Sequence, residues 1–210
     1  MHPAVAAFPN RMFYFKECLK PVPLSHQKET RLHYELPSQD TLDDALKAHR
    51  MLFIPSKTCH HSQLSDKVNP EEAHIVAILL GRIYRFYGNS FDADKTIGVI
   101  VPYRNQIAMI RKEIEKLGIK ALERISIDTV ERYQGSQRDV IIYSFTVQHR
   151  YQLDFLTANC FEENGHIIDR KLNVAVTRAR KQMIITGNEM VLNQDPIFKE
   201  LIASCELGHL

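Results

Sequence analysis

Short runs of apolar, largely β-branched residues, separated by amphipathic segments, constrain the fold of this chain more than any other feature. The run TIGVIV at 96–101 ends at Pro102 and is typical of a strand that is buried on both faces. Similar apolar runs predict strands over 125–130, 139–145 and 182–187. Buried strands that alternate with amphipathic helices predict an α/β fold, with a mainly parallel sheet and helices on both of its faces.

The segments between these strands carry the signals of helix ends. Asn69 can cap a helix that begins at Pro70 and ends at Gly88, and Glu72 can complete a capping box. Helical spacing predicts further helices over 103–117, 169–180 and about 195–204.

The chain is predicted to form one domain over residues 1–210, with a core over about 69–205. Ahead of that core, the first eight residues could form a short helix and 50–55 a strand. Residues 24–68 as a whole fit an irregular connection or insertion. The organisation of the chain is therefore expected to change near residue 69.

Bulk composition excludes several classes of protein. No run of about 18 apolar residues occurs, so no membrane span is predicted, and the N-terminus lacks the pattern of a signal peptide. The net charge is only +2, so any anion binding must come from a local patch. The scattered cysteines predict reduced thiols in an intracellular protein, either cytoplasmic or of the nucleus or nucleoid; they are Cys18, Cys59, Cys160 and Cys205.

Three polar clusters lie near the predicted strand ends, where ligands of parallel sheets gather. The first, PYRNQ, opens a helix directly after the strand at 96–101. Tyr103 could stack on a base, Arg104 could pair with a phosphate, and Gln106 could form a hydrogen bond. The alternative is an ordinary helix start with a solvated arginine.

The second cluster is TVERYQGSQRD, residues 129–139. Gly135 between polar residues predicts a tight turn at which a ligand can approach the backbone closely. Thr129 could hydrogen-bond to a phosphate, and Gln134 could bridge polar groups. The alternative is a polar connection between two strands.

The third cluster surrounds Arg178. Residues 170–181 contain five basic side chains and no acidic one, so local carboxylates cannot neutralise them all. On the predicted helix, Arg178 and Arg180 point about 200° apart, and Arg178 lies beside the apolar face. A partly buried arginine needs an anionic partner, and a phosphate from outside the chain is favoured over a distant Asp or Glu.

Signatures of a metal site and of a phosphate loop are absent from the sequence. Cys59-His60-His61 resembles metal ligands, but adjacent residues rarely chelate one ion and no second pair follows at finger spacing, so no metal site is predicted. The sequence has no G-x-x-x-x-G-K-[ST] loop and no Asp-Glu pair that follows a strand and could hold Mg²⁺. The chain thus has groups suited to sense a nucleoside triphosphate but lacks those that hold it.

Four stretches, taken in order, resemble the second RecA-like domain of superfamily 1 helicases: PYRNQ, TVERYQGSQRDVII, LNVAVTRAR and then IITGN. The subgroup is the Upf-one-like branch, which includes RNA-decay and flap-processing helicases. The opening MHPAVAAFPNRMFY and the stretch VNPEEAHIVAILL resemble the same family, so the likeness covers the chain except residues 24–68. It implies a RecA-like fold and an ATP-dependent helicase in which ATP lies between two RecA-like domains.

The resemblance implies that ATP and Mg²⁺ are held mainly by the first RecA-like domain, which this chain lacks. Arg178 would be the arginine finger on the γ-phosphate. The nucleotide side of the cleft would be formed by Gln134, Gly135, Gln137 and Arg180. Single-stranded DNA or RNA would be faced by Tyr103, Arg104, Gln106 and Thr129. The family usually has Glu at the position of Gln137, which implies a different nucleotide selectivity.

The family's arginine before Met-His-Pro would precede Met1, so the chain looks like a piece of a longer protein or a natural truncation. Because half of the ATP site is absent, we expect the chain alone to have negligible ATPase activity. A rival interpretation is a non-catalytic single-strand-binding module that kept the RecA-like shape. A third interpretation is a nucleotide-binding α/β enzyme, but the sequence contains no Gly-rich fingerprint that would support it.

Overall fold

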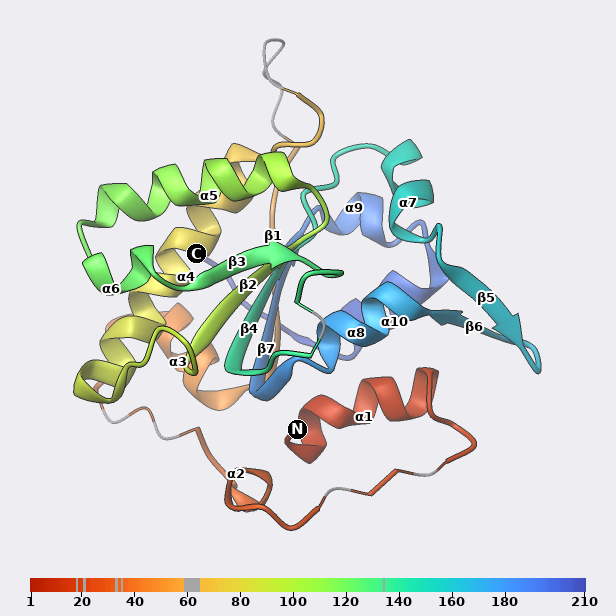
Figure 1. The fold of residues 1–210 in the computed structure, drawn as a ribbon, viewed down its shortest axis with the longest axis horizontal. Helices are drawn as coiled ribbons and strands as arrows, with labels where there is room; N and C mark the ends of the chain where they lie inside the picture. The colour runs from red at the N-terminus through yellow and green to blue at the C-terminus, as the bar shows by residue number, and fades with distance from the viewer. Residues whose placement is uncertain (18, 21, 33, 35, 59–64, 134) are drawn as a thin grey trace.

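One six-stranded sheet, in the order β3-β2-β4-β7-β1-β8, forms the centre of the structure, and all of its neighbouring strands run parallel. The structure is a computed structural model that describes all residues except 18, 21, 33, 35, 59–64 and 134. The strands are β1 (Met51–Pro55), β2 (Ile97–Val101), β3 (Ser126–Thr129), β4 (Arg138–Ser144), β7 (Ala179–Gly187) and β8 (Glu206–Leu207). The predicted fold class, a RecA-like α/β sheet with helices on both faces, is confirmed (Figure 1).

Two hydrophobic cores lie on opposite faces of the sheet, because successive side chains of a strand point to opposite faces. Ile142 and Ile184 face one core, whereas Ile141 and Ile185 face the other. The first core is covered by α3 (Thr41–Ala48), α4 (Pro70–Tyr87), α5 (Arg104–Leu117) and α6 (Lys120–Glu123). The second is covered by α1 (Pro3–Met12), α8 (Arg170–Val176) and α10 (Pro196–Ala203).

Shorter elements complete the fold. An antiparallel hairpin, β5 (Cys160–Glu163) and β6 (His166–Asp169), projects from the body of the domain (Figure 1). The remaining helices are α2 (Ser25–Lys28), the 3-10 turn η1 (Gly88–Ser90), α7 (Tyr151–Leu156) and α9 (Glu189–Leu192). Both α7 and the hairpin lie between β4 and α8, in a stretch for which the sequence predicted no element.

The predicted helix over 169–180 is wrong at its end. Helix α8 stops at Val176, where the Thr177 hydroxyl donates to the Asn173 carbonyl, and β7 already begins at Ala179. Pairing with β4 extends the strand in this direction, since Ala179 lies opposite Arg138. Arg178 therefore lies in a turn and Arg180 in a strand, so the helical angle between them does not apply.

The span 24–68 is not irregular throughout. It contains α3 and β1, and β1 lies inside the sheet between β7 and β8. The apolar run at 51–54 is buried there, and Leu42 and Leu46 of α3 are buried against the helical face. The packed core thus begins well before residue 69. The extent of the domain over 1–210 stays a prediction.

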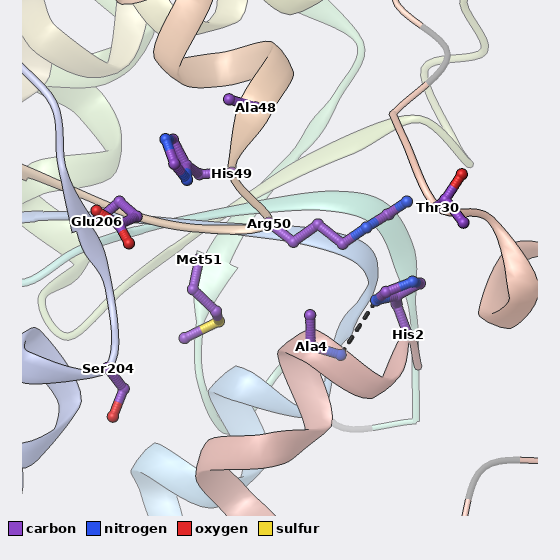
Figure 2. Close-up of a pocket in the computed structure, with 9 residues that line it drawn as sticks. All are labelled: His2, Ala4, Thr30, Ala48, His49, Arg50, Met51, Ser204 and Glu206. Atoms are coloured by element: carbon purple, nitrogen blue, oxygen red, sulfur yellow. Dashed lines mark hydrogen bonds between the residues drawn. The ribbon is translucent and has the colours of Figure 1, made fainter.

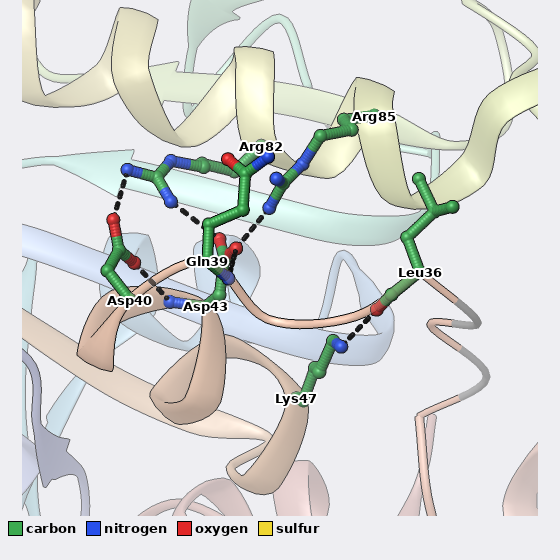
Figure 3. A network of polar contacts seen from close by, with 7 residues as sticks. All are labelled: Leu36, Gln39, Asp40, Asp43, Lys47, Arg82 and Arg85. Atoms are coloured by element: carbon green, nitrogen blue, oxygen red, sulfur yellow. Dashed lines mark hydrogen bonds and ion pairs between the residues drawn. The ribbon is translucent and has the colours of Figure 1, made fainter.

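Helix α3 is fixed to α4 by a cluster of charged side chains. Asp43 is fully buried and forms ion pairs with Arg82 at 2.8 Å and with Arg85, while Arg82 also reaches Asp40 at 2.7 Å (Figure 3). The Asp43 oxygen that pairs with Arg85 also accepts a hydrogen bond from the backbone N–H of Gln39 at 2.8 Å. One carboxylate thus ties the start of α3 to the last turns of α4.

Candidate functional site

The predicted site residues lie at two opposite edges of the sheet. The edge where β4 and β7 begin, here called the amino edge, carries Gly135, Gln137, Arg178 and Arg180. The edge where β2 and β3 end, here called the carboxyl edge, carries Tyr103, Arg104, Gln106 and Thr129. The nine residues of β7, at about 3.3 Å each, separate the two edges by roughly 25 Å.

The loop 130–137 connects the two edges. It leaves β3 at the carboxyl edge and must cross the sheet to enter β4, because both strands run parallel to β2. Tyr133 of this loop lies on β2 over Gly98, where a Cβ would be only 1.7 Å from the Tyr133 hydroxyl oxygen. Gly98 is therefore required for the crossing, and the crossing places Gly135 beside the start of β7.

Arg178 has a guanidinium group without a carboxylate partner among the residues that the structure describes. Its Nε donates to the Val174 carbonyl at 3.0 Å, and one terminal nitrogen donates to the Thr177 hydroxyl at 3.0 Å. These contacts hold the partly buried side chain along the last turn of α8. The charge is thus positioned by neutral acceptors, and no acid in the described part of the chain neutralises it.

Other basic side chains of the segment 170–181 do have such partners. Lys171 pairs with Glu131 at 3.2 Å, and Lys181 pairs with Asp139 at 3.2 Å. Arg180 lies 3.5 Å from the other oxygen of Asp139. The guanidinium of Arg170 lies over the ring of Phe161, 4.5 Å from its centroid. The alternative of a distant acidic partner therefore holds for Lys171, Arg180 and Lys181, but not for Arg178.

The turn at Gly135 lies directly beside Arg178. The Arg138 N–H donates to the Arg178 carbonyl at 3.0 Å, which joins the turn to the start of β7. Gly135 has a φ of +86°, a conformation that side-chain-bearing residues adopt at a cost, so the predicted tight turn is confirmed. Gly135 and Gln137 are exposed, whereas Gln134 lies outside the described residues. The amino edge thus presents open backbone beside a positive charge.

A cavity of about 320 Å³ adjoins the amino edge, between the start of α1 and the start of β1 (Figure 2). It is lined by residues that include His2, His49, Arg50 and Glu206, and by none of the predicted site residues. Arg50 is buried and donates to the Lys181 and Glu29 carbonyls, and burial lowers the pKa of its guanidinium. The backbone N–H of His2, which lines the cavity, donates to the Arg180 carbonyl at 2.7 Å, so the start of α1 is bonded to β7 next to the cavity.

At the carboxyl edge, most of the predicted contact residues are buried. Tyr103 is 7% exposed and Thr129 is 8% exposed, and burial raises the pKa of Tyr103. Gln106 is fully buried, and both ends of its amide bond to the backbone of Asn69 at 2.9 Å. The prediction that Gln106 contacts nucleic acid is therefore wrong: its helix turns it toward the start of α4. Arg104 is exposed.

Glu72 is a fully buried carboxyl at the same edge. Its Oε2 accepts from the Ser144 hydroxyl at 2.7 Å and the Thr146 N–H at 2.8 Å, and its Oε1 accepts from Ser56 and Asn69 at 3.2 Å each. The predicted cap by Asn69 is confirmed, but Glu72 points into the protein and does not close a capping box. Burial raises the pKa of Glu72 to about 7, against the opposing effect of these hydrogen bonds.

This carboxyl makes the stability of the domain depend on pH. Because the pKa rises from 4.5 in the unfolded chain to about 7, the contribution of Glu72 to the free energy of unfolding is full below pH 4.5 and is lost as the pH rises through 7. The loss corresponds to about 3 kcal/mol. Glu72→Gln is neutral at every pH and is expected to remove that loss. Urea unfolding of both proteins at pH 5 and pH 8 measures it; an equal stability difference at the two pH values would contradict the assignment.

The exposed aromatic side chains of α7 were not predicted from the sequence. Tyr151 is 58% exposed and Phe155 is 46% exposed, and the Phe155 ring stacks on the buried ring of Tyr103 with centroids 5.0 Å apart. The signal in the sequence is two aromatic residues four positions apart, a spacing that places both on one helical face; the first comes seven residues after the end of β4.

Neither a metal-binding group nor a membrane-spanning helix is found among the described residues. They contain no group of three or more His, Cys, Asp or Glu side chains that could hold a metal ion, and Cys59-His60-His61 lie outside the described residues. None of the described helices combines the length and the apolar character that crossing a bilayer requires.

Comparison with known proteins places this geometry in a family. A family model described as an AAA domain matches residues 1–190. The chain is 30% identical over 206 residues to "Probable RNA helicase armi" of Drosophila melanogaster. The aligned residues are 97% of this chain and 17% of that protein. It is 26% identical over 204 residues to "Helicase sen1" of Schizosaccharomyces pombe, with coverage of 96% and 11%.

A shorter match and one solved structure add to these relatives. "Regulator of nonsense transcripts 1" of Dictyostelium discoideum is 38% identical over 111 residues, which are 51% of this chain and 8% of that protein. The crystal structure of the C-terminal domain of a possible DNA helicase from Lactobacillus plantarum WCFS1 aligns with a TM-score of 0.45 and 11% identity, over 80% of this chain and 92% of that chain. The chain thus spans less than a fifth of the length of these three relatives.

Proposed function

Since the match over residues 1–190 shows that this chain belongs to the AAA domain family, we propose that it is the second RecA-like motor domain of a superfamily 1 helicase of the Upf-one-like branch. In this proposal the domain completes an ATPase site whose phosphate loop and Mg²⁺-binding acid lie on a first RecA-like domain of the same protein. The protein would act on single-stranded DNA or RNA inside the cell.

A single observation carries the proposal: Arg178 lacks a carboxylate partner among the described residues, although Lys171, Arg180 and Lys181 in the same segment have one. Leaving a partly buried guanidinium without an anion is costly unless an external anion claims it. A γ-phosphate suits this role, because an arginine that reaches it stabilises the charge that develops during phosphoryl transfer.

The turn beside Arg178 supports the same assignment. Apart from Gly135 itself and its two chain neighbours, no described atom lies within 4 Å of the place where a Cβ of Gly135 would be, so a ligand can approach the backbone there. Gln137 is exposed on the turn and can donate or accept a hydrogen bond without adding a charge. We assign Gly135, Gln137 and Gln134 to the nucleotide side of the cleft. Arg180 is assigned to the same side with less support, because Asp139 already offsets its charge.

The carboxyl edge is assigned to the nucleic acid. Arg104 is exposed at the start of α5 and is available to a phosphate, and Thr129 ends β3 close by. Tyr103 serves mainly as packing for its neighbours, because little of its ring is exposed. The nucleotide and the single-stranded nucleic acid would therefore bind at edges of the sheet about 25 Å apart. The loop 130–137 and α8 connect these two edges.

The ATPase activity of the isolated domain tests this division of the site. The purified 210-residue chain is expected to hydrolyse ATP no faster than the buffer, because it lacks a phosphate loop. The full-length protein is expected to hydrolyse ATP with Mg²⁺ and to respond to single strands. Colorimetric phosphate release measures both. Robust Mg²⁺-dependent hydrolysis by the 210 residues alone would contradict the proposal, and salt-dependent strand binding without any ATPase in the full-length protein would favour the rival binding module.

A further inference from the structure

We infer that the exposed face of α7 is a base-stacking surface for single-stranded nucleic acid at the carboxyl edge. The inference rests on the proposed function and adds the residues that contact the bases. Tyr151 and Phe155 are four positions apart, so both rings lie on the same side of this short helix. Among the described residues, the exposed aromatic side chains are Tyr151, Phe155 and Phe161, and two of these three lie on α7.

The opposite face of α7 fixes the helix to the body of the domain. Gln152, Leu153 and Leu156 are buried. The Gln152 oxygen accepts from the backbone N–H groups of Gln148 at 2.8 Å and His149 at 3.0 Å, and its nitrogen donates to the Asp66 carbonyl at 2.8 Å. The exposed rings therefore sit on an anchored element, and little conformational freedom has to be lost when a base binds.

The rings themselves are held in defined orientations. The Phe155 ring stacks on Tyr103 with an interplanar angle of 23°, and the Tyr151 ring stacks on His149 with an interplanar angle of 11°. The Tyr151 hydroxyl donates to the Asp66 carboxylate at 2.8 Å. Both rings still keep about half of their surface open to solvent, with exposures of 58% and 46%. Bases can extend these short stacks outward.

Basic side chains lie close to the two rings in the chain or in the fold. Arg104 is the residue after Tyr103, on whose ring Phe155 stacks, and Arg150 immediately precedes α7; both arginines are exposed. The Lys171 ammonium lies 4.6 Å from the centroid of Phe155. Two nearby acids already have partners: Glu131 pairs with Lys171, and Asp66 accepts from the Tyr151 hydroxyl. Asp154 is exposed.

Aromatic faces beside cations are the combination that proteins use to bind single strands without sequence preference. The buried state of Tyr103, Gln106 and Thr129 strengthens the assignment, because bases cannot stack on these side chains. At this edge the open rings belong to α7. A strand whose phosphates lie on Arg104 and Arg150 can place its bases on Tyr151 and Phe155.

Strand binding by single-ring variants of the full-length protein tests the inference. The variants are Tyr151→Ala and Phe155→Leu, of which the second keeps an apolar side chain against Tyr103. Fluorescence anisotropy with labelled oligothymidylate and oligouridylate gives the affinity, and each variant is expected to bind roughly 5- to 150-fold more weakly. A 2-aminopurine base in the strand reports stacking directly, and its quenching is expected to decrease. Phe161→Ala, an exposed aromatic on the hairpin, is the matched control and should bind like the wild type.

The salt dependence separates stacking from charge. The ring variants are expected to keep the wild-type slope of log affinity against log salt, whereas Arg104→Ala should reduce it by about 1. Wild-type affinity and quenching in both ring variants would overturn the inference, leave the proposed function standing and assign the rings to a protein partner. Failure of the wild-type protein to bind either oligonucleotide would instead overturn the proposed function.

Discussion

Arg178→Ala is expected to lower the ATP turnover of the full-length protein about 10³-fold or more, while single-strand affinity stays within a few-fold of the wild type. The guanidinium is held by the Val174 carbonyl and the Thr177 hydroxyl, which leave its charge available to a phosphate. Strand binding should persist because the carboxyl edge lies at the other end of the strands. Steady-state phosphate release gives kcat and KM, and anisotropy with a labelled oligonucleotide gives the strand affinity.

Two further variants make the Arg178 result specific. Arg178→Lys keeps the charge but not the forked, planar donor set, so its turnover should lie between those of the wild type and the alanine variant. Arg170→Ala removes an arginine of the same segment that lies over Phe161, and its turnover should stay within a few-fold of the wild type. Thermal melting checks that losing the two contacts of Arg178 does not unfold α8. Unchanged turnover in a folded Arg178→Ala protein would refute the arginine-finger role.

Asp43→Ala is expected to destabilise the domain by about 3–5 kcal/mol. The substitution removes the buried carboxylate that pairs with Arg82 and Arg85 and that accepts from the Gln39 N–H. The two guanidinium groups keep about a quarter of their side-chain surface exposed, at 23% and 24%, so water offsets part of the loss and the lower end of the range applies. For a domain of this size, a loss of that order lowers the melting temperature by roughly 6–12 °C.

The neighbouring Asp44 offers the matched control for this prediction. It lies on the same helix, one position further, and is exposed. Asp44→Ala should change the free energy of unfolding by no more than about 0.5 kcal/mol. Urea unfolding of the wild type and both variants measures the difference. Equal stabilities for Asp43→Ala and Asp44→Ala would show that the cluster in Figure 3 does not fasten α3 to α4.

The strand core could be predicted from sequence because its apolar runs are continuous. The runs at 96–101 and 139–145 became β2 and β4 with bounds shifted by at most one residue, since strands buried on both faces carry no polar interruption. The helix starts at Asn69 and Tyr103 were predicted from local capping and strand-end signals. Each of these signals depends on a few adjacent residues, so no knowledge of the tertiary structure is needed.

Other parts depend on partners far away in the chain. The end of α8 was misplaced because Ala179 and Arg180 have helical spacing but belong to strand β7, in which Ala179 lies opposite Arg138 of β4. Gln106 looked like a polar contact residue, and only the position of α4 shows that its amide is used by Asn69. Asp43 and Asp44 look alike in sequence, yet the two arginines of α4 make one buried and leave the other exposed.

The division of the site between two edges was equally beyond the sequence. The three clusters could be recognised as polar segments near strand ends. That the turn at Gly135 lies at the opposite edge from Thr129 follows from the crossing of loop 130–137, in which Tyr133 lies over Gly98. The sequence does contain the rings of α7, but their exposure depends on the anchoring of Gln152 and Leu153. The assigned roles of Arg178, Gly135 and Gln137 remain predictions that kinetics must test.

Trapping of ADP with aluminium fluoride, a mimic of the transferring γ-phosphate, tests the central claim most directly. In the presence of Mg²⁺ and a single strand, the full-length wild-type protein is expected to retain ADP and aluminium fluoride in a slowly dissociating complex. Arg178→Ala should bind ADP alone as the wild type does but fail to form that complex, because its loss affects only the γ-phosphate position. Equal trapping by the two proteins would show that the guanidinium at position 178 does not contact the γ-phosphate of a bound triphosphate.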